Sequence, residues 1–203
     1  GLTLYLLGRF DEAADEYLRC LGLGSGGAGR RGVRAGGSRG SAVPSGDPRQ
    51  CAHTSSDPAS RVAMTAWAVR ALRQAGREGE ARALLAALPA HLDVEALDGP
   101  FPQYAGSPIV PGDNLHYWCV LRFYRGDASA GELLDPKAWG EQWPTVAHGV
   151  AAWWMAEGRK AEARALLEEI VADPHWARLG HVAAEADLGR LRGGDPAFPS
   201  GSR

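Results

Sequence analysis

Two short stretches of this chain combine cysteine with histidine at spacings that suit metal or nucleophile chemistry. They are Cys51-x-His53 and His116-x-x-Cys119. Thiolate sulfur and imidazole nitrogen are favoured zinc ligands, but a structural zinc ion takes four of them and neither stretch supplies four. A Cys–His nucleophile needs an orienting group and an oxyanion hole, and no residues stand out for these roles. The sequence therefore predicts no metal site, no cofactor and no catalytic centre.

Tryptophan and carboxylate side chains gather in the last third of the chain. The residues concerned are Trp139, Trp143, Trp153, Trp154 and Trp176, with Glu132, Asp135 and Glu141 among them. Paired carboxylates beside a sugar-binding surface are the equipment of glycoside hydrolases. Large aromatic rings also fill the space between packed helices. We interpret the rings as packing, and a module that binds or hydrolyses a glycan stays open as the alternative.

Composition restricts the classes of partner. The 203 residues are 45% hydrophobic and 23% charged, and 22 basic residues against 24 acidic ones give a net charge of −2. This balance creates no overall field for nucleic acid or an acidic membrane, and no apolar run approaches the ~20 residues of a membrane span. We therefore expect neither nucleic acid nor a membrane span. Three widely spaced cysteines favour reduced thiols, although one disulfide pair stays open.

The N-terminus and the residue usage of the chain give only broad expectations about its processing, location and source. The sequence starts without Met inside an apolar helical pattern, Leu2 to Leu7, which predicts a truncated or processed N-terminus. We expect a soluble protein and favour the cytoplasm, with export and the oligomeric state left open. The 27 glycines, 13 prolines and a strong preference for Arg over Lys indicate a GC-rich bacterial source.

Four glycines divide the chain into helical hairpins. Each ends an apolar helical pattern and is followed by a short polar stretch and a helix rich in alanine, and the four are Gly8, Gly76, Gly126 and Gly158. Glycine adopts the left-handed conformation in which many helices end. The distance from Gly8 to Gly76 is 68 residues, and a helix–turn–helix unit recurring at about 34 residues is typical of stacked hairpin arrays.

These signals predict the organisation of the whole chain. We expect an N-terminal hairpin over 1–21, a low-complexity insert over 22–56, degenerate helical repeats over 57–192 with a Pro-rich loop at 89–112, and a tail over 193–203. The Gly- and Arg-rich stretch has little to bury and a large entropy cost of ordering, so we expect it to be flexible. Whether it is a true insert or a sequence artefact stays open.

The first hairpin resembles a tetratricopeptide repeat. The second helix of that repeat carries the pattern Gly-x-aromatic-x2-Ala-x3-aromatic-x2-small, which Gly8, Phe10, Ala13, Tyr17 and Cys20 fit at every position. The units that follow Gly76 and Gly158 fit in part, and the unit after Gly126 fits least. The resemblance to bacterial repeat proteins of this kind implies an all-α fold, an α-solenoid of antiparallel helical hairpins in a right-handed superhelix.

The resemblance also implies a function, a non-catalytic scaffold that binds a protein or peptide partner in its concave groove. In that family the first helices line the groove, and the contacting positions precede each turn glycine at fixed intervals. Among the matching positions of this chain, and with the neighbouring aromatic Tyr124 added, we expect the partner contacts to come from eight residues: Arg70, Arg73, Asp113, His116, Phe123, Tyr124, Thr145 and His148. Arg70 and Arg73 would form a basic end suited to a carboxylate or acidic peptide. The alternative is a solvated face without a ligand.

Overall fold

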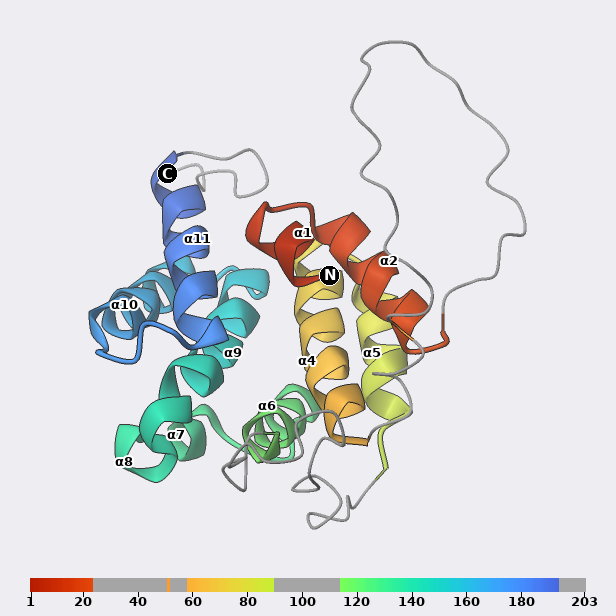
Figure 1. Cartoon of the computed structure of the whole chain (residues 1–203), viewed down its shortest axis with the longest axis horizontal. Coiled ribbons are helices and arrows are strands. Elements are labelled where there is room, and N and C mark those ends of the chain that lie inside the picture. Colours follow the sequence, from red (N-terminus) through yellow and green to blue (C-terminus); the bar gives the residue numbers. More distant parts are fainter. Residues whose placement is uncertain (24–50, 52–57, 90–113, 194–203) are drawn as a thin grey trace, which may run out of the picture.

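Every regular element of the described structure is a helix (Figure 1). The computed structural model describes residues 1–23, 51, 58–89 and 114–193, and no strand occurs among them. The all-α prediction is therefore confirmed. Most of the expected insert, nearly all of the Pro-rich loop, Asp113 and most of the tail lie outside the described residues. None of the described helices combines the length and the apolar composition that crossing a bilayer requires.

The helices follow one another largely as hairpins. Their bounds are α1 (Leu2–Leu6), α2 (Phe10–Cys20), α4 (Pro58–Gln74), α5 (Glu78–Ala86), α6 (Leu115–Arg125), α7 (Ala130–Leu133), α8 (Pro136–Trp139), α9 (Trp143–Ala156), α10 (Lys160–Ala172) and α11 (Leu179–Gly193). A short 3-10 turn, Gly140–Gln142, joins α8 to α9.

The same backbone turn ends the first helix of each expected hairpin. At Gly76, φ is +74°, its N–H donates to the Arg73 carbonyl over 3.0 Å, and the next N–H, of Arg77, donates to the Leu72 carbonyl over 2.8 Å. The other three turn glycines also have positive φ and make the same pair of bonds. This is the Schellman arrangement, in which glycine avoids the clash that a Cβ meets at positive φ. The four turns are where the sequence predicted them.

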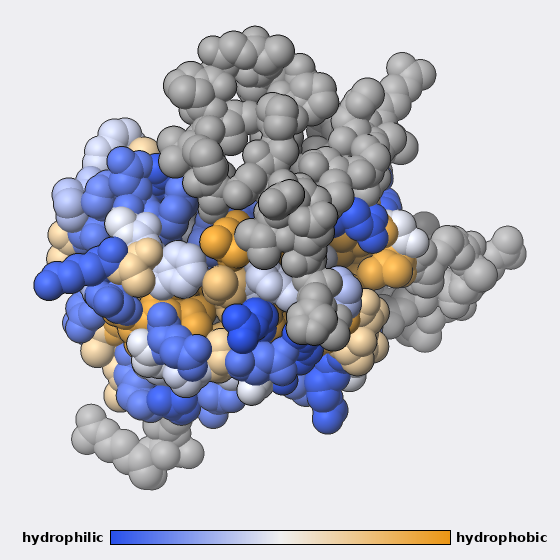
Figure 2. Space-filling view, turned by 90° about the horizontal axis from the view of Figure 1, so that it is seen from below, coloured by the Kyte–Doolittle hydropathy of each residue, from blue (hydrophilic) through white to orange (hydrophobic). Residues whose placement is uncertain are grey.

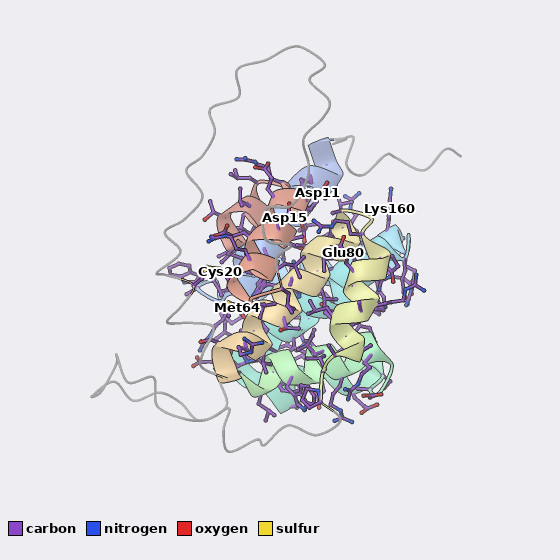
Figure 3. The ribbon with its side chains drawn as sticks, turned by 90° about the vertical axis from the view of Figure 1, so that its right-hand side faces the viewer. Asp11, Asp15, Cys20, Met64, Glu80 and Lys160 are labelled. Carbon is purple, nitrogen blue, oxygen red and sulfur yellow. A yellow bond between two sulfur atoms is a disulfide. The ribbon has the colours of Figure 1, made fainter. Side chains whose placement is uncertain are left out.

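An arginine follows three of these glycines and begins the next helix. Each is the N-cap residue, and each pairs with the glutamate three positions on: Arg9 with Glu12, Arg77 with Glu80, and Arg159 with Glu162, over 2.7 to 2.8 Å. A carboxylate in the first turn also interacts favourably with the helix dipole. Arg77 also donates to Asp15 of α2 over 2.7 Å, so that it links two hairpins; Figure 3 labels its partners Asp15 on α2 and Glu80 on α5.

Helices α4 and α9 form the centre of the molecule. Every residue over 65–72 of α4 and over 143–152 of α9 is buried. A helix buried on all sides needs neighbours on all sides. Helix α4 contacts α2, α5, α6 and α9, and α9 contacts α4, α6, α10 and α11. The first and last described helices also touch, because Arg190 of α11 donates to the Leu6 carbonyl over 2.7 Å.

The cysteines differ from the simpler expectation of three reduced thiols. Cys20, the last residue of α2, forms a disulfide with Cys51. Cys119 is free and half-buried, and burial raises the pKa of its thiol. The sequence left one pair open without identifying it, because the two partners are 31 residues apart and only the fold brings them together.

We expect alanine to have opposite effects on stability at Gly76 and Gly79. Gly76 has φ +74°, where a Cβ costs about 1–2 kcal/mol. Gly79 lies inside α5 with nothing within 4 Å of an added Cβ, so alanine should stabilise the helix by about 0.5–1 kcal/mol. Urea denaturation followed by circular dichroism measures both changes. Equal effects of the two substitutions would show that the turn conformation does not limit stability.

Candidate functional site

A chain of buried polar side chains crosses the core from α4 to α11. Arg70 is only 2% exposed; its Nε–H donates to the Tyr124 hydroxyl over 2.9 Å, and its Nη1 lies 3.3 Å from His148 Nδ1. His148 Nε2 lies 2.9 Å from Asp187 Oδ2, and the second oxygen of Asp187 accepts from Arg190. The network therefore connects α4, α6, α9 and α11, and Arg190 extends it to α1.

The hydrogen bonds determine the state of His148. A guanidinium only donates, so His148 Nδ1 must accept from Arg70, and the proton on Nε2 is donated to Asp187. This tautomer is neutral. Burial lowers the pKa of His148, although the Asp187 carboxylate acts in the opposite direction. Because both ring nitrogens are already hydrogen-bonded inside the core, the imidazole has no free position for a substrate proton.

Aromatic rings and a glycine shape the surroundings of Arg70. Its Cζ atom lies 4.4 Å from the ring centroid of Trp67 and 5.9 Å from that of Tyr117, distances typical of cation–π contacts. A Cβ on Gly149 would come within 2.9 Å of Arg70 Nη2. The glycine therefore lets the guanidinium lie directly against α9, where Nη2 also approaches the Thr145 carbonyl at 3.5 Å.

Five of the eight residues predicted to line a groove are buried. They are Arg70, His116, Tyr124, Thr145 and His148. The structure brings Arg70, Tyr124 and His148 together, but inside the core. The expectation of a solvent-facing wall is corrected because α4, α6 and α9, which were to form that wall, pack against one another. Partner binding by these residues stays a prediction.

Arg73 and Phe123 meet at Trp153 and do not join the Arg70 network. The Cζ atom of Arg73 lies 3.4 Å from the Trp153 ring centroid, and the Phe123 ring lies 5.9 Å from it. Arg73 also donates to Glu78 over 3.1 Å. The expected basic end made by two arginines is therefore corrected, because Arg70 turns into the core and Arg73 has a ring and a carboxylate as partners. The last groove residue, Asp113, lies outside the described residues.

Except for the exposed Trp176, the tryptophans of the glycan alternative pack against the core, and its three carboxylates have structural partners. Trp143 is buried, and Trp139 and Trp153 are half-buried against the core. The three carboxylates are equally occupied: Glu132 closes a capping box with Ser129, Asp135 caps α8, and Glu141 pairs with Arg178.

The two Cys–His stretches do not assemble a ligand set among the described residues. Cys51 is bonded to Cys20, and His53 lies outside the described part of the chain. The donor atoms of Glu16, Cys20 and Cys51 lie within 4.8 Å of one another, but the two sulfurs are bonded to each other and Glu16 accepts from Arg19 over 2.7 Å.

Sequence reasoning missed an exposed apolar surface at the start of α11. Trp176 is 72% exposed, and Leu179 and Val182 are 44% and 38% exposed; we name these three residues the Trp176 surface. Their spacing of three residues places Leu179 and Val182 on one side of α11, with Trp176 just before the helix. On the face shown in Figure 2, the visible hydrophobic residues form small areas among hydrophilic ones.

Asp187 and Arg190 were also missed, although the sequence carries a signal for one of them. Asp187 is fully buried and stands between the buried residues Ala183, Ala184 and Leu188. An acidic residue inside the apolar stripe of a helix indicates a buried polar partner, since an isolated charge in the core is costly. The identity of that partner, His148, is 39 residues away and depends on the packing of α11 on α9.

The neutral state of His148 should make the chain less stable in acid. Because its folded pKa lies below the ordinary 6.5, the unfolded chain binds a proton that the folded chain does not. The contribution is fully present above about pH 6.5 and decreases below it, by up to ~1.4 kcal/mol per pH unit for one group. Urea denaturation between about pH 5 and pH 7.5 measures this slope.

A pair of variants isolates the contribution of His148. In His148→Gln the amide can accept from Arg70 and donate to Asp187 without titrating, so the slope should become shallower. Leu7→Ser changes an exposed side chain that carries no titratable group and should keep the wild-type slope. An unchanged slope in His148→Gln would contradict the neutral assignment.

Comparisons of the chain with models of known protein families, with curated proteins and with solved structures found no match.

Proposed function

We propose that this chain is a non-catalytic module that binds a protein or peptide partner through the Trp176 surface. The observation that carries the proposal is the 72% exposure of Trp176, since the other six tryptophans are buried or half-buried. Leu179 and Val182 extend the apolar surface beside it. Exposed apolar patches mark interaction sites, and tryptophan is enriched among the residues that dominate binding energy.

The chemistry of the polar residues supports a role without catalysis. General acid–base work needs a titratable group that can reach a substrate. His148 uses both ring nitrogens inside the core, and the carboxylates beside the tryptophans cap helices or pair with arginine. The polar side chains of the network therefore orient the packed helices. The partner would bind to the accessible surface instead.

We further propose that the hairpins are degenerate tetratricopeptide repeats arranged in a short solenoid. Three features support this: the same glycine turn at four positions, the repeated arginine–glutamate pair, and a buried alanine at the matching place of three second helices. These alanines, Ala13, Ala81 and Ala163, are at most 1% exposed. A small side chain there allows two helices to approach closely. In this arrangement the partner binds the outer side of α11, and the groove side is occupied by helix packing.

Phage display of random peptides against the immobilised chain tests the proposed function. Selected peptides are titrated by fluorescence polarisation against the wild type and against Trp176→Ser. Loss of a central tryptophan should weaken binding about tenfold or more. The melting temperature should change little, because the side chain is exposed. Leu7→Ser is the matched control: Leu7 is 65% exposed but lies at the end of α1, so affinity should stay unchanged.

Two results would contradict the proposal. Equal affinity of the wild type and Trp176→Ser would place peptide binding on another surface. Failure to select any peptide, together with Trp176-dependent binding on an oligosaccharide array, would identify the exposed tryptophan as part of a glycan site.

A further inference from the structure

Arg70 brings a positive charge into the core, and no carboxylate pairs with it in the part of the chain that the structure describes. Its acceptors are the Tyr124 hydroxyl, His148 Nδ1 and the Thr145 carbonyl, all uncharged. The carboxylate of this network, Asp187, is paired with Arg190. Because His148 is neutral, the two arginines and one aspartate leave one positive charge in excess. A buried ion without a counter-ion is costly, and the contact with the Trp67 ring offsets only part of that cost.

Hydrogen-bond donors without acceptors lie in the same region. Arg70 has five N–H groups, of which three have acceptors among the described residues. The Tyr5 hydroxyl and Arg190 Nε are buried and have no hydrogen-bond partner there. Burial raises the pKa of Tyr5 well above its ordinary value, so its hydroxyl keeps the proton and can donate. The region therefore has both excess positive charge and excess donors.

Tyr5 packs against the two aromatic rings that contact the arginines. Its ring centroid is 5.2 Å from that of Trp67, the ring against which Arg70 stacks at 4.4 Å. It is also 5.2 Å from the ring of Phe10, which lies 5.1 Å from the Arg190 guanidinium. The Tyr5 hydroxyl, Arg70 and Arg190 therefore belong to one buried cluster of side chains from α1, α4 and α11, which also contains the Asp187 carboxylate.

We propose that Arg70, Tyr5 and Arg190 bind one small monovalent anion of about the size of chloride. Such an ion neutralises the single excess charge and accepts hydrogen bonds from the guanidinium groups and the phenol. A water molecule would accept hydrogen bonds but leave the excess positive charge uncompensated. A divalent oxyanion would carry more negative charge than the single excess positive charge. The surrounding rings exclude bulk solvent, which strengthens the attraction between the ion and the arginines. Helix α1 has only five residues, so local opening of this segment gives the ion a route.

Bromide is the probe, because it replaces chloride and scatters anomalously. Crystals of the chain grown in sodium bromide should show an anomalous peak within hydrogen-bonding distance of the Tyr5 hydroxyl and the Arg70 guanidinium. In solution, bromide or chloride should raise the melting temperature relative to gluconate, which is too large to enter, at matched ionic strength. The rise should saturate with concentration, as binding to the folded state alone requires.

Variants separate the site from general salt effects. Tyr5→Phe keeps the ring but removes the hydroxyl, and should shift the bromide midpoint to several-fold higher concentration. Arg70→Met removes the excess charge and should abolish the halide-specific rise. Arg164→Gln removes an exposed charge that pairs with Glu168, and should respond to halides as the wild type does. If Arg70→Met does not fold, the halide response of Tyr5→Phe and the anomalous signal in the bromide crystals still test the site.

Two outcomes would overturn the proposal. One is density at this position without anomalous signal, which would assign water as the partner of Tyr5. The other is a melting temperature that responds equally to halides and gluconate, or equally in the wild type and in Tyr5→Phe. Neither outcome depends on partner binding at the Trp176 surface, so the proposed function and the anion site are tested separately.

Discussion

The packing of this chain depends on the burial of one guanidinium. Arg70 lies in the second half of α4, the helix with neighbours on every side, and its hydrogen-bond and ring partners among the described residues are uncharged. A charge in this position is tolerated only when its neighbours hold fixed orientations, because each lost hydrogen bond leaves a donor unsatisfied. Tyr124 orients α6, and His148 with the closely approaching Gly149 orients α9.

The same constraint extends outward to the ends of the described structure. His148 donates a hydrogen bond to Asp187 on α11, and Asp187 accepts one from Arg190. Arg190 in turn donates to the Leu6 carbonyl at the end of α1. Apolar packing alone is non-directional and accepts several arrangements of similar helices. A continuous series of polar contacts is directional, and it joins the first described helix to the last.

Local features of this structure could be predicted from the sequence, and long-range ones could not. The turn at Gly76 depends on a positive φ and two nearby carbonyls, all within a few residues, so a glycine after an apolar stripe was enough to predict it. The burial of Arg70 depends on Tyr124 and His148, which are 54 and 78 residues away. Arg70 and Arg73 stand on the same helix with the same chemistry, and Arg73 differs by having a nearby partner, Glu78, and a distant one, Trp153. The Cys20–Cys51 pair and the exposure of Trp176 follow the same rule.

Helix α11 is where the rigid interior meets the proposed binding surface. Its inner side carries Asp187 and Arg190, which are fixed by charge-assisted contacts to α9 and α1, and its outer side carries Leu179 and Val182. Gly180 brings α11 so close to α9 that a Cβ there would meet the Pro144 carbonyl at 2.2 Å. A surface held in this way loses little conformational entropy when a partner binds. The buried charges therefore serve the proposed function indirectly, because they hold the start of α11 in a single orientation in which its apolar residues face outward.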